Sequence, residues 1–554
     1  MTQYTSAKEF ESAYSALFST FATGKTKDLK WRKWQLKQVW WMIIENEAEI
    51  LDALSSDLNR HEFESHGADL LGLKTDTLEH IEHLEEWTAD EIPDAGVIFG
   101  TLGKARVRKE PLGVALIIGA WNFPFLLLLQ PMLAAIAAGC CVMLKPSELA
   151  EASQALLVSL IPRYLDPSAI CIVTGGPAET GRILEHRFNH IFFTGSSKVA
   201  RFITAAAAKH LTPLVLELGG QGPAIVTASA DVDLAAKRIA YGKFMNAGQI
   251  CLSINHVFAD PVVYDELVER LSFWFAKFMD GSYDGYCKII NERNFDRLAS
   301  LLDKTQGKLV CGGKRDRSTC FFDPTVVRDV TTSDSLLSEE LFGPILPVIK
   351  ANHVDAYKTI ASEKAWNIHL LYTSSPRSNR SSTRVSVLRY YHPLILFVTE
   401  LTLLVLANTN SGGVTINDVI MHAGVPNAPF GGVGDSGYGA YHGFHGFLCF
   451  THQRVVVAPP TWLDMVMSFR YPPYDLKHLS KVAVAKKLGF QPGEQISDQI
   501  IHRGGKGSVW MKSMKLLAQV VICFALARLV LQRGTLINET KGLWQGVARK
   551  LQLS

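Results

Sequence analysis

The chain has 554 residues, which is too long for a single hydrophobic core and predicts two or more lobes. Its hydrophobic fraction of 47% and aromatic fraction of 10% fit a well-packed soluble enzyme and exclude an intrinsically disordered protein. Nine cysteines without regular spacing or a CxxC pattern argue against a disulfide framework and a bound metal, and indicate reduced thiols inside the cell. Residues 1–30 contain charges and lack the apolar stretch of a secretory signal.

The formal net charge is +3, but it is unevenly distributed. Residues 501–554 hold nine Lys or Arg and one acid, a net charge of +8, which leaves −5 for residues 1–500. Nucleic-acid binding would require basic residues on a folded face with aromatic residues between them, and the sequence lacks that pattern. A basic tail beside an apolar stretch suits an anionic membrane surface better.

Residues 6–87 are predicted to be helical, because leucines and aromatic residues recur at helical spacing, with no Pro and few Gly. A break follows at 92–103, then strands within 107–118 and a buried helix over 124–138. The chain next alternates between strands expected at 141–144, 169–174 and 190–193 and helices expected at 149–160 and 179–186. This alternation predicts βαβ units in a parallel sheet, a dinucleotide-binding architecture. It resumes over 217–349 and predicts a second α/β lobe.

Two polar segments follow predicted strands, and the first of them has the features of a nucleotide-binding turn. Gly195 and Ser196 lie where a strand ends and a helix begins, so backbone amides there could bind a pyrophosphate. The alternative is a glycine required by the turn alone. Lys145 and Glu148, in Met-Leu-Lys-Pro-Ser-Glu, follow another strand. The alternative for them is a surface loop in which Ser147 or Glu148 caps a helix.

The candidate catalytic pair is Cys251, in Gly-Gln-Ile-Cys, and Glu217, in Glu-Leu-Gly-Gly. A thiolate is a strong nucleophile toward a carbonyl, and a carboxylate can activate water to hydrolyse the resulting thioester. Gly248 and Gln249 predict an irregular loop in which the thiol could be exposed. The alternative is that Cys251 is a small core residue, as most cysteines are.

Together with two further motifs, these segments closely resemble the aldehyde dehydrogenase superfamily. The ordered set is Gly-Ala-Trp-Asn-Phe-Pro-Phe (119–125), Glu-Leu-Gly-Gly (217–220), Gly-Gln-Ile-Cys (248–251) and Glu-Glu-Leu-Phe-Gly-Pro (339–344). The resemblance covers roughly residues 6–365 and 408–458. It implies an α/β aldehyde dehydrogenase fold, with a Rossmann-like NAD-binding lobe, an α/β catalytic lobe and a small β oligomerisation arm. The expected domains are 1–217 for NAD binding (with part of the arm near 88–106), 218–415 for catalysis, 416–460 for the active-site and oligomerisation segment, and 461–554 for the tail.

The resemblance assigns three catalytic roles. Cys251 would attack the aldehyde carbon, and Glu217 would activate the water that cleaves the thioester. The side-chain amide of Asn122 and the backbone N–H of Cys251 would stabilise the tetrahedral oxyanion, at about 3 kcal/mol per donor. On its own, Asn122 could be a turn residue before Phe-Pro.

The resemblance also implies NAD as cofactor, with NADP as an alternative. The cofactor-binding residues it indicates are Trp121, Lys145, Glu148, Gly195, Ser196, Glu340 and Phe342. Lys145 would contact the adenosine ribose, where the Glu148 carboxylate would repel a 2′-phosphate and so favour NAD. Glu340 would hold the nicotinamide ribose, and Phe342 would pack against the nicotinamide. Alternatively, Glu339 and Glu340 form a solvated pair near a turn.

A late block resembles the class 3, fatty-aldehyde-like branch of the family. It consists of Asn-Asp-Val-Ile-Met-His (417–422), Pro-Phe-Gly-Gly-Val-Gly-Asp-Ser-Gly (429–437) and Ala-Tyr-His-Gly (440–443). Fungal enzymes that act on apocarotenals are especially similar. The branch implies a long-chain fatty or other apolar aldehyde as substrate and a homodimer.

Two segments depart from this pattern. Residues 366–391 are rich in Ser and Arg and are interpreted either as a gene-model error or as a surface insertion. An error there would favour a catalytically impaired relative that serves as a membrane-associated binding or structural protein.

Residues 516–531 are mostly apolar but would form a helix of only ~24 Å, against ~30 Å of hydrocarbon. Enzymes of the branch often end in a membrane anchor, so we expect an intracellular protein bound to the cytosolic face of the endoplasmic reticulum or another organelle. The alternative is a helix packed on a cytoplasmic enzyme.

Overall fold

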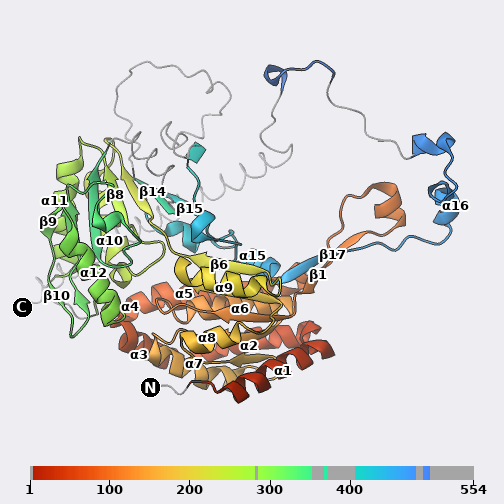
Figure 1. Cartoon of the computed structure of the whole chain (residues 1–554), viewed down its shortest axis with the longest axis horizontal. Coiled ribbons are helices and arrows are strands. Elements are labelled where there is room, and N and C mark those ends of the chain that lie inside the picture. Colours follow the sequence, from red (N-terminus) through yellow and green to blue (C-terminus); the bar gives the residue numbers. More distant parts are fainter. Residues whose placement is uncertain are drawn as a thin grey trace, which may run out of the picture. The chain divides into compact units, whose positions relative to one another are not determined.

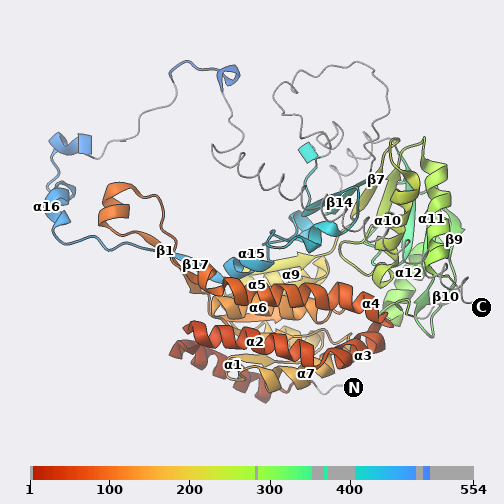
Figure 2. The same cartoon turned by 180° about the vertical axis from the view of Figure 1, so that it is seen from behind.

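The computed structural model describes residues 4–280, 285–351, 367–371, 406–407, 409–481 and 491–499. The chain divides into two units, Met1–Thr461 and Trp462–Ser554, and both large sheets belong to the first. Figure 1 shows these sheets with their covering helices, and Figure 2 shows them from behind. In the second unit, the described part contains short helical elements such as α16 (Leu463–Met467).

The N-terminal part of the first unit is helical, as predicted for residues 6–87. Its helices are α1 (Ala7–Thr23), α2 (Leu29–Glu45), α3 (Glu47–Leu58), α4 (Glu62–Ser65) and α5 (Leu71–Thr88). Ser6 and Glu9 form a capping box that starts α1, and Gly24 ends it with a left-handed φ of 76°. Helices α2 and α5 pack on each other and on α6 (Leu126–Ala138), as Figure 2 shows. They cover one face of the first sheet.

The first sheet has six strands, and the predicted βαβ alternation is confirmed. Its order is β16 (Gly437–Tyr438), β6 (Leu214–Leu218), β5 (His190–Gly195), β2 (Val114–Ile118), β3 (Cys141–Lys145) and β4 (Ile170–Ile172). All neighbours are parallel except β16, which runs antiparallel to β6. The connecting helices are α6, α7 (Glu151–Tyr164), α8 (Pro177–Ile183) and α9 (Ser197–Ala208). Helices on both faces bury the central strands, which explains their continuous apolar sequences.

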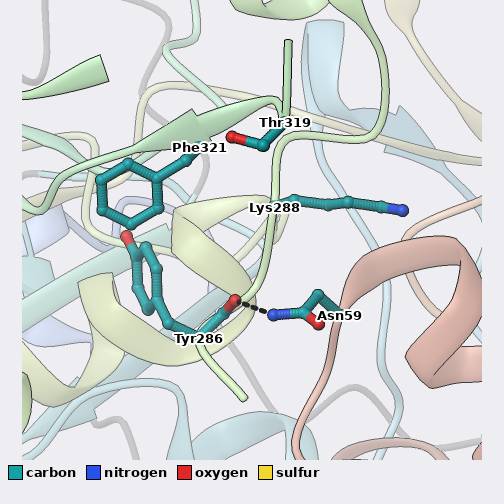
Figure 3. Close-up of a pocket in the computed structure, with 5 residues that line it drawn as sticks. All are labelled: Asn59, Tyr286, Lys288, Thr319 and Phe321. Atoms are coloured by element: carbon teal, nitrogen blue, oxygen red, sulfur yellow. Dashed lines mark hydrogen bonds between the residues drawn. The ribbon is translucent and has the colours of Figure 1, made fainter. Parts of the chain in front are cut away.

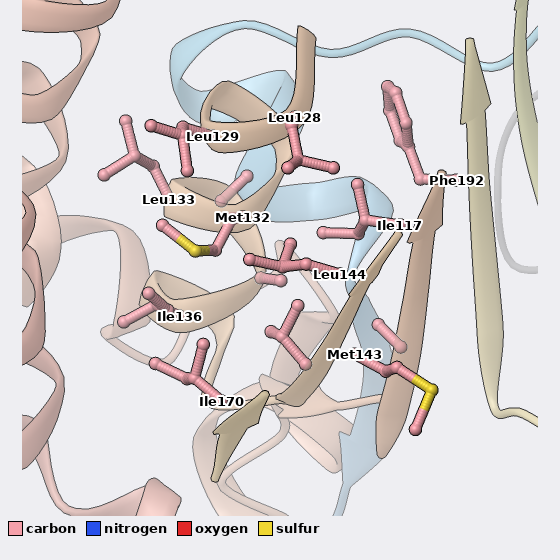
Figure 4. Packing of buried hydrophobic residues seen from close by; sticks show 14 of the residues in the cluster. Ile117, Leu128, Leu129, Met132, Leu133, Ile136, Met143, Leu144, Ile170 and Phe192 are labelled. Carbon is pink, nitrogen blue, oxygen red and sulfur yellow. The ribbon is translucent and has the colours of Figure 1, made fainter. Parts of the chain in front are cut away.

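The core of this sheet lies between its strands and α6 (Figure 4). Leu128 and Met132 of α6 meet Ile117 and Leu144 of the strands, and all four side chains are buried. Helix α6 is apolar around its whole circumference, which fits a helix enclosed on every side.

The second sheet has seven strands and belongs to the predicted second α/β lobe. Its order is β15 (Gly413–Ile416), β14 (Asn367–Leu371), β7 (Pro223–Val226), β8 (His256–Ala259), β13 (Ile345–Lys350), β12 (Thr325–Arg328) and β9 (Lys308–Cys311). Only β9 is antiparallel to its neighbour. Helices α10 (Val232–Phe244), α11 (Tyr264–Phe278) and α12 (Glu292–Lys304) accompany it in Figure 1.

Strand β14 lies within the insertion expected at 366–391, so the start of that segment is part of the sheet and is not a surface loop. Residues 367–371 pair with β7 on one side and β15 on the other, so the segment begins as a sheet strand. The rest of the expected insertion lies outside the described residues.

A two-stranded antiparallel ribbon, β1 (Arg106–Pro111) with β17 (Thr451–Val456), stands apart from both sheets. The predicted break at 92–103 differs in part, because residues 96–102 form wide helical turns closed by a bond from Gly103 N to Ile98 O of 2.8 Å. Within the described residues, none of the helices combines the length and apolarity needed to cross a bilayer. The apolar segment 516–531 lies outside the described part of the chain.

Candidate active site

The predicted site residues converge on one edge of the six-stranded sheet. Parallel strands end at the same edge, and β2, β3, β5 and β6 are neighbours there. The segments at these carboxyl ends carry Trp121 and Asn122 after β2, Lys145 and Glu148 at β3, Gly195 and Ser196 at β5, and Glu217 in β6. The topology therefore brings together residues that lie far apart in the sequence.

The loop that carries Cys251 has an unusual backbone. Asn246, Ala247 and Gly248 have φ values of 50°, 49° and 69°, so three consecutive residues are left-handed. A Cβ at Gly248 would lie 2.3 Å from the carbonyl oxygen of Gly343, so only glycine fits there. The predicted irregular loop is thus present, and Cys251 in it is partly exposed.

Asn122 lies directly against this loop. Its side chain is buried, and its Nδ2 donates to the carbonyl oxygen of Gln249 at 3.1 Å. This bond joins the motif after β2 to the segment two residues before Cys251. The amide and the thiol are therefore held in one local structure, which is the arrangement that an oxyanion site requires.

Two carboxyl groups act on the Cys251 thiol. Burial, and then the negative charges of Glu340 and Glu217, raise the pKa of Cys251 to about 12. Burial also raises the pKa of Glu217 well above 4.5, and within the described structure its Oε1 has no hydrogen-bond partner. At neutral pH the thiol is protonated, and a nearby group must accept its proton for attack to occur.

Glu340 is directed inward, unlike its neighbour Glu339. Burial raises the pKa of Glu340 to about 7, and a Cβ at Gly219 would lie 2.0 Å from its Oε2. Glu339 is half exposed and pairs with Arg297 at 3.0 Å. Glu339 is therefore the more solvated of the two acids, whereas the Glu340 carboxylate lies against Gly219.

Phe342 and Trp121 form an aromatic corner near Glu340. Their ring centroids are 5.4 Å apart in an edge-to-face arrangement. Phe342 has a left-handed φ of 47°, so the turn after Glu340 directs its side chain toward the segment that follows β2. The late motif thus contacts the segment that follows β2 of the first sheet.

Lys145 and Glu148 form an ion pair rather than a helix cap. Lys145 Nζ lies 2.7 Å from Glu148 Oε2, with the lysine side chain 5% and the glutamate 25% exposed. The orphan amides at the start of α7 are instead bound by Asp57 of α3, which accepts from Ala152 N and Ser153 N at 2.9 and 2.8 Å. The capping alternative for Glu148 is therefore wrong.

Gly195 and Ser196 sit at the junction of β5 and α9. Ser196 is the N-cap of α9, and its Oγ accepts from Val199 N at 3.4 Å. A Cβ at Gly195 would lie 2.5 Å from the ring of Phe193, so the glycine is also required sterically. Both interpretations of this turn are compatible with the geometry, since the turn leads directly into the N-terminus of α9.

One supporting residue of the site had no signal in the sequence. Arg60, in the N-terminal helical part, is fully buried and contacts both Asn122 and Asn246. These contacts span 62 and 186 positions, so no local pattern could have revealed them. A charged side chain is rarely buried without partners, but the sequence does not tell which arginine is buried.

A separate cavity has a volume of about 430 Å³ (Figure 3). Its lining residues are Asn59, Tyr286, Lys288, Thr319 and Phe321, none of which was predicted to be functional. Its wall is connected to the thiol loop, because Gln249 Nε2 donates to the carbonyl oxygen of Lys288 at 3.0 Å. Across the described residues, no cluster of His, Cys, Asp or Glu could hold a metal ion.

The fold is a two-sheet α/β architecture whose predicted site residues gather at one sheet edge, and comparison with known proteins gives its family. The chain belongs to the aldehyde dehydrogenase family, whose model matches residues 2–366. It is 38% identical over 471 residues to Beta-apo-4'-carotenal oxygenase from Neurospora crassa, covering 83% of each chain. It is 37% identical to the dimeric NADP-preferring aldehyde dehydrogenase of Canis lupus familiaris, covering 82% of this chain and 96% of the relative.

A solved structure agrees with this assignment. Substrate-bound AldH of Staphylococcus aureus superposes with a TM-score of 0.74 at 31% identity, covering 83% of this chain and 99% of that one. The resemblance and the fold class expected from the sequence are thereby confirmed. The protein is an NAD(P)-dependent enzyme that oxidises aldehydes to carboxylic acids.

Proposed function

We propose that the chain oxidises long-chain or other apolar aldehydes, with Cys251 as nucleophile, Asn122 as oxyanion donor and Glu217 as the base for thioester hydrolysis. One observation carries the proposal. The Asn122 amide is bonded to the loop of Cys251, and Glu217 lies close enough to raise the pKa of the thiol. Three groups with complementary roles therefore share one small volume.

The residues at the sheet edge fit a bound dinucleotide. The Glu340 carboxylate lies against Gly219, in space that a side chain at position 219 would need. Ser196 is the N-cap of α9, which begins at the carboxyl end of β5 in the first sheet. Lys145 and Glu148 would hold the adenosine ribose, and Glu340 the nicotinamide ribose. The remaining cofactor residues of the proposal are Gly195 and Ser196 for the pyrophosphate, and Trp121 and Phe342 for the nicotinamide. When bound, NAD(P)+ supplies the hydride acceptor.

The negative charge of Glu148 supports NAD over NADP. In the described structure it is balanced by Lys145 alone, at 2.7 Å. A 2′-phosphate would meet this carboxylate at the adenosine ribose and would be repelled. The canine relative is named as NADP-preferring. The proposed preference of this chain for NAD therefore differs from that of the canine enzyme.

The chemistry of the chain's own residues follows from their protonation. The Cys251 sulfur forms a bond to the aldehyde carbon while its proton passes to a nearby carboxylate. The carbonyl oxygen gains the negative charge, which Asn122 Nδ2 and the Cys251 N–H stabilise. After oxidation to the thioester, Glu217 takes a proton from water, the hydroxide adds to the carbonyl, and the C–S bond breaks. The carboxylic acid leaves and the thiol is restored.

The surroundings of the thiol support an apolar substrate. Cys251 packs against the buried apolar cluster of Phe123, Leu127, Ile250 and Leu252. The apolar chain of a substrate, extending from the reacting carbon, would be stabilised there by the hydrophobic effect. The carotenal in the name of the Neurospora relative fits the same property.

A mutant pair tests the assigned roles. We expect Cys251→Ala to abolish NADH production and ester hydrolysis together, because both need the nucleophile. Glu217→Gln should give one equivalent of NADH per site and then stop, with an acyl adduct on Cys251 in the mass spectrum. Cys171→Ala, which changes another thiol of the first lobe, is the control and should keep full activity. Undiminished steady-state turnover by Glu217→Gln would exclude its role as base.

The substrate class is tested by NADH formation with hexadecanal, benzaldehyde and an apocarotenal in detergent. We expect the two apolar long-chain aldehydes to have the higher kcat/KM. A preference for benzaldehyde would contradict the proposed class while leaving aldehyde oxidation intact.

We further propose a homodimer and association with an intracellular membrane. The dimeric relative supports the first, and so does the β1–β17 ribbon, which pairs with neither large sheet and whose strand β17 is mostly exposed. The basic, apolar composition of residues 501–554 supports the second.

A further inference from the structure

We infer that Arg60 is a positioning residue that sets Asn122 and the Cys251 loop relative to each other, an inference that rests on the proposed function. Arg60 follows α3 and precedes α4, and only 2% of it is exposed. It belongs to the N-terminal helical part, to which the sequence assigned no role in catalysis. Its guanidinium nevertheless contacts Asn122, the candidate oxyanion donor.

The guanidinium makes contacts in three directions. Nη1 donates to Asp69 Oδ2 at 2.8 Å, and both side chains of this ion pair are fully buried. Nε and Nη2 donate to Asn246 Oδ1 at 3.3 and 2.8 Å. Nη2 also donates to the backbone carbonyl of Asn122. The guanidinium carbon lies 4.8 Å from the ring centroid of Phe123, which closes one face.

Asn246 passes this constraint on to the thiol loop. Its Nδ2 donates to the carbonyl oxygens of Gln249 at 3.0 Å and Asn122 at 3.3 Å. The Gln249 carbonyl is the same oxygen that accepts from Asn122 Nδ2. Arg60, Asn246 and Asn122 therefore form one network around a peptide two residues before Cys251.

The backbone of this loop needs such support. Asn246 and Ala247 both adopt left-handed φ, a conformation that is unfavourable for a residue with a Cβ such as alanine. The Asn246 N–H is also tied down, since it donates to Glu64 Oε1 at 2.6 Å. Without external bonds the loop would relax toward ordinary φ values, and the Cys251 N–H and Sγ would move with it.

Lysine cannot replace Arg60 in this network. The guanidinium is planar and directs its N–H groups to Asp69, Asn246 and Asn122 at once, whereas an ammonium is a single point of charge. Arg60→Lys keeps the charge opposite Asp69, so the buried carboxylate stays paired. The variant therefore removes the geometry while retaining the electrostatic balance.

The chain offers a matched control in Arg32. This arginine is also buried, at 5% exposure, and donates to the carbonyl oxygens of Thr26, Lys27 and Ala137. It supports the C-terminal end of α6 and touches none of the proposed catalytic residues. Arg32→Lys should therefore lower the thermal midpoint as Arg60→Lys does, without changing the chemistry.

The test compares the full-length wild type, Arg60→Lys and Arg32→Lys. Activity of the wild type that is lost in Cys251→Ala establishes the proposed function first. We then expect Arg60→Lys to lower kcat about 100-fold, the effect of losing one oxyanion donor, with the Kd for NAD+ within about twofold of wild type. Arg32→Lys should keep wild-type kcat. Equal kcat in wild type and Arg60→Lys would overturn the inference while leaving the proposed function intact.

A second variant covers the case in which Arg60→Lys does not fold. Asn246→Asp keeps an acceptor for Arg60 but replaces the donor that faces the Gln249 and Asn122 carbonyls with an oxygen. The kcat of this variant should fall by a similar factor while NAD+ binding persists. Wild-type kcat in Asn246→Asp would overturn the inference on its own.

Discussion

At the scale of single residues, the thiol of Cys251 is surrounded by groups that disfavour its ionised form. With a pKa near 12, the thiolate fraction grows about tenfold per pH unit throughout the neutral and mildly basic range. We therefore expect alkylation of the cofactor-free enzyme by iodoacetamide to accelerate steadily from pH 7 to pH 10. Mass spectrometry of the Cys251 peptide measures this rate, and a plateau below pH 9 would contradict the high pKa.

Glu340 provides the means to change this pKa. Its own pKa is about 7, so at pH 8 its carboxylate is mostly ionised and raises the pKa of Cys251. Glu340→Gln removes that charge and should increase the alkylation rate at pH 8 by about three- to tenfold. Glu339→Gln is the matched control, because the Glu339 carboxylate is half exposed and paired with Arg297. Equal rates in the two variants would show that Glu340 does not influence the thiol.

At the scale of elements, β5 begins with a buried histidine that has consequences for stability. Burial lowers the pKa of His190 to about 4, and within the described structure neither ring nitrogen has a hydrogen-bond partner. Between pH 6.5 and pH 4 the unfolded chain therefore binds a proton that the folded chain does not. Stability is fully present above pH 6.5 and falls with pH, by up to about 1.4 kcal/mol per pH unit.

The variant His190→Phe should remove this part of the pH dependence. The ring centroids of His190 and Phe450 are 4.8 Å apart in an edge-to-face contact, and the phenylalanine ring would keep this contact. On lowering the pH from 7 to 4.5, we expect the wild type to lose about 2 kcal/mol more unfolding free energy than the variant in urea titrations. His452→Phe on the exposed face of β17 controls for the added ring. Parallel pH profiles for wild type and His190→Phe would refute the assignment.

The sequence was informative about elements because their signals are local. Alternating apolar strands and helices predicted the parallel sheet, and short motifs located Cys251, Glu217 and Asn122. The contacts between elements were not predictable, since they depend on side chains far apart in the chain. Asp57 caps α7 from a distance of 95 positions, and Arg60 reaches Asn246 across 186. Burial of these charges is decided by the packed fold and leaves no periodic pattern in the sequence.

At the scale of the whole molecule, the site draws on both sheets. The six-stranded sheet contributes its carboxyl edge, and the seven-stranded sheet contributes the loops before β8 and β13 that carry Cys251 and Glu340. Both sheets and the β1–β17 ribbon belong to Met1–Thr461. The catalytic unit therefore ends well before the basic, apolar segment at 501–554.

This separation predicts the behaviour of a chain cut after residue 500. It should keep aldehyde oxidation, because every proposed site residue precedes the cut. It should also remain a dimer, since a two-stranded ribbon is marginal alone and exposes Val455 at 67%, a surface that a second copy would cover. It should leave the membrane fraction, having lost the net charge of +8 that would bind anionic lipid.

Sedimentation with vesicles containing anionic lipid, light scattering and NADH formation measure these three properties on the same preparations of full-length and shortened protein. Vesicles of neutral lipid are the control for charge, and full-length protein should bind them more weakly. Continued sedimentation of the shortened chain would place the membrane contact in the catalytic unit. A monomeric but active shortened chain would assign the dimer contact to the tail and exclude the ribbon.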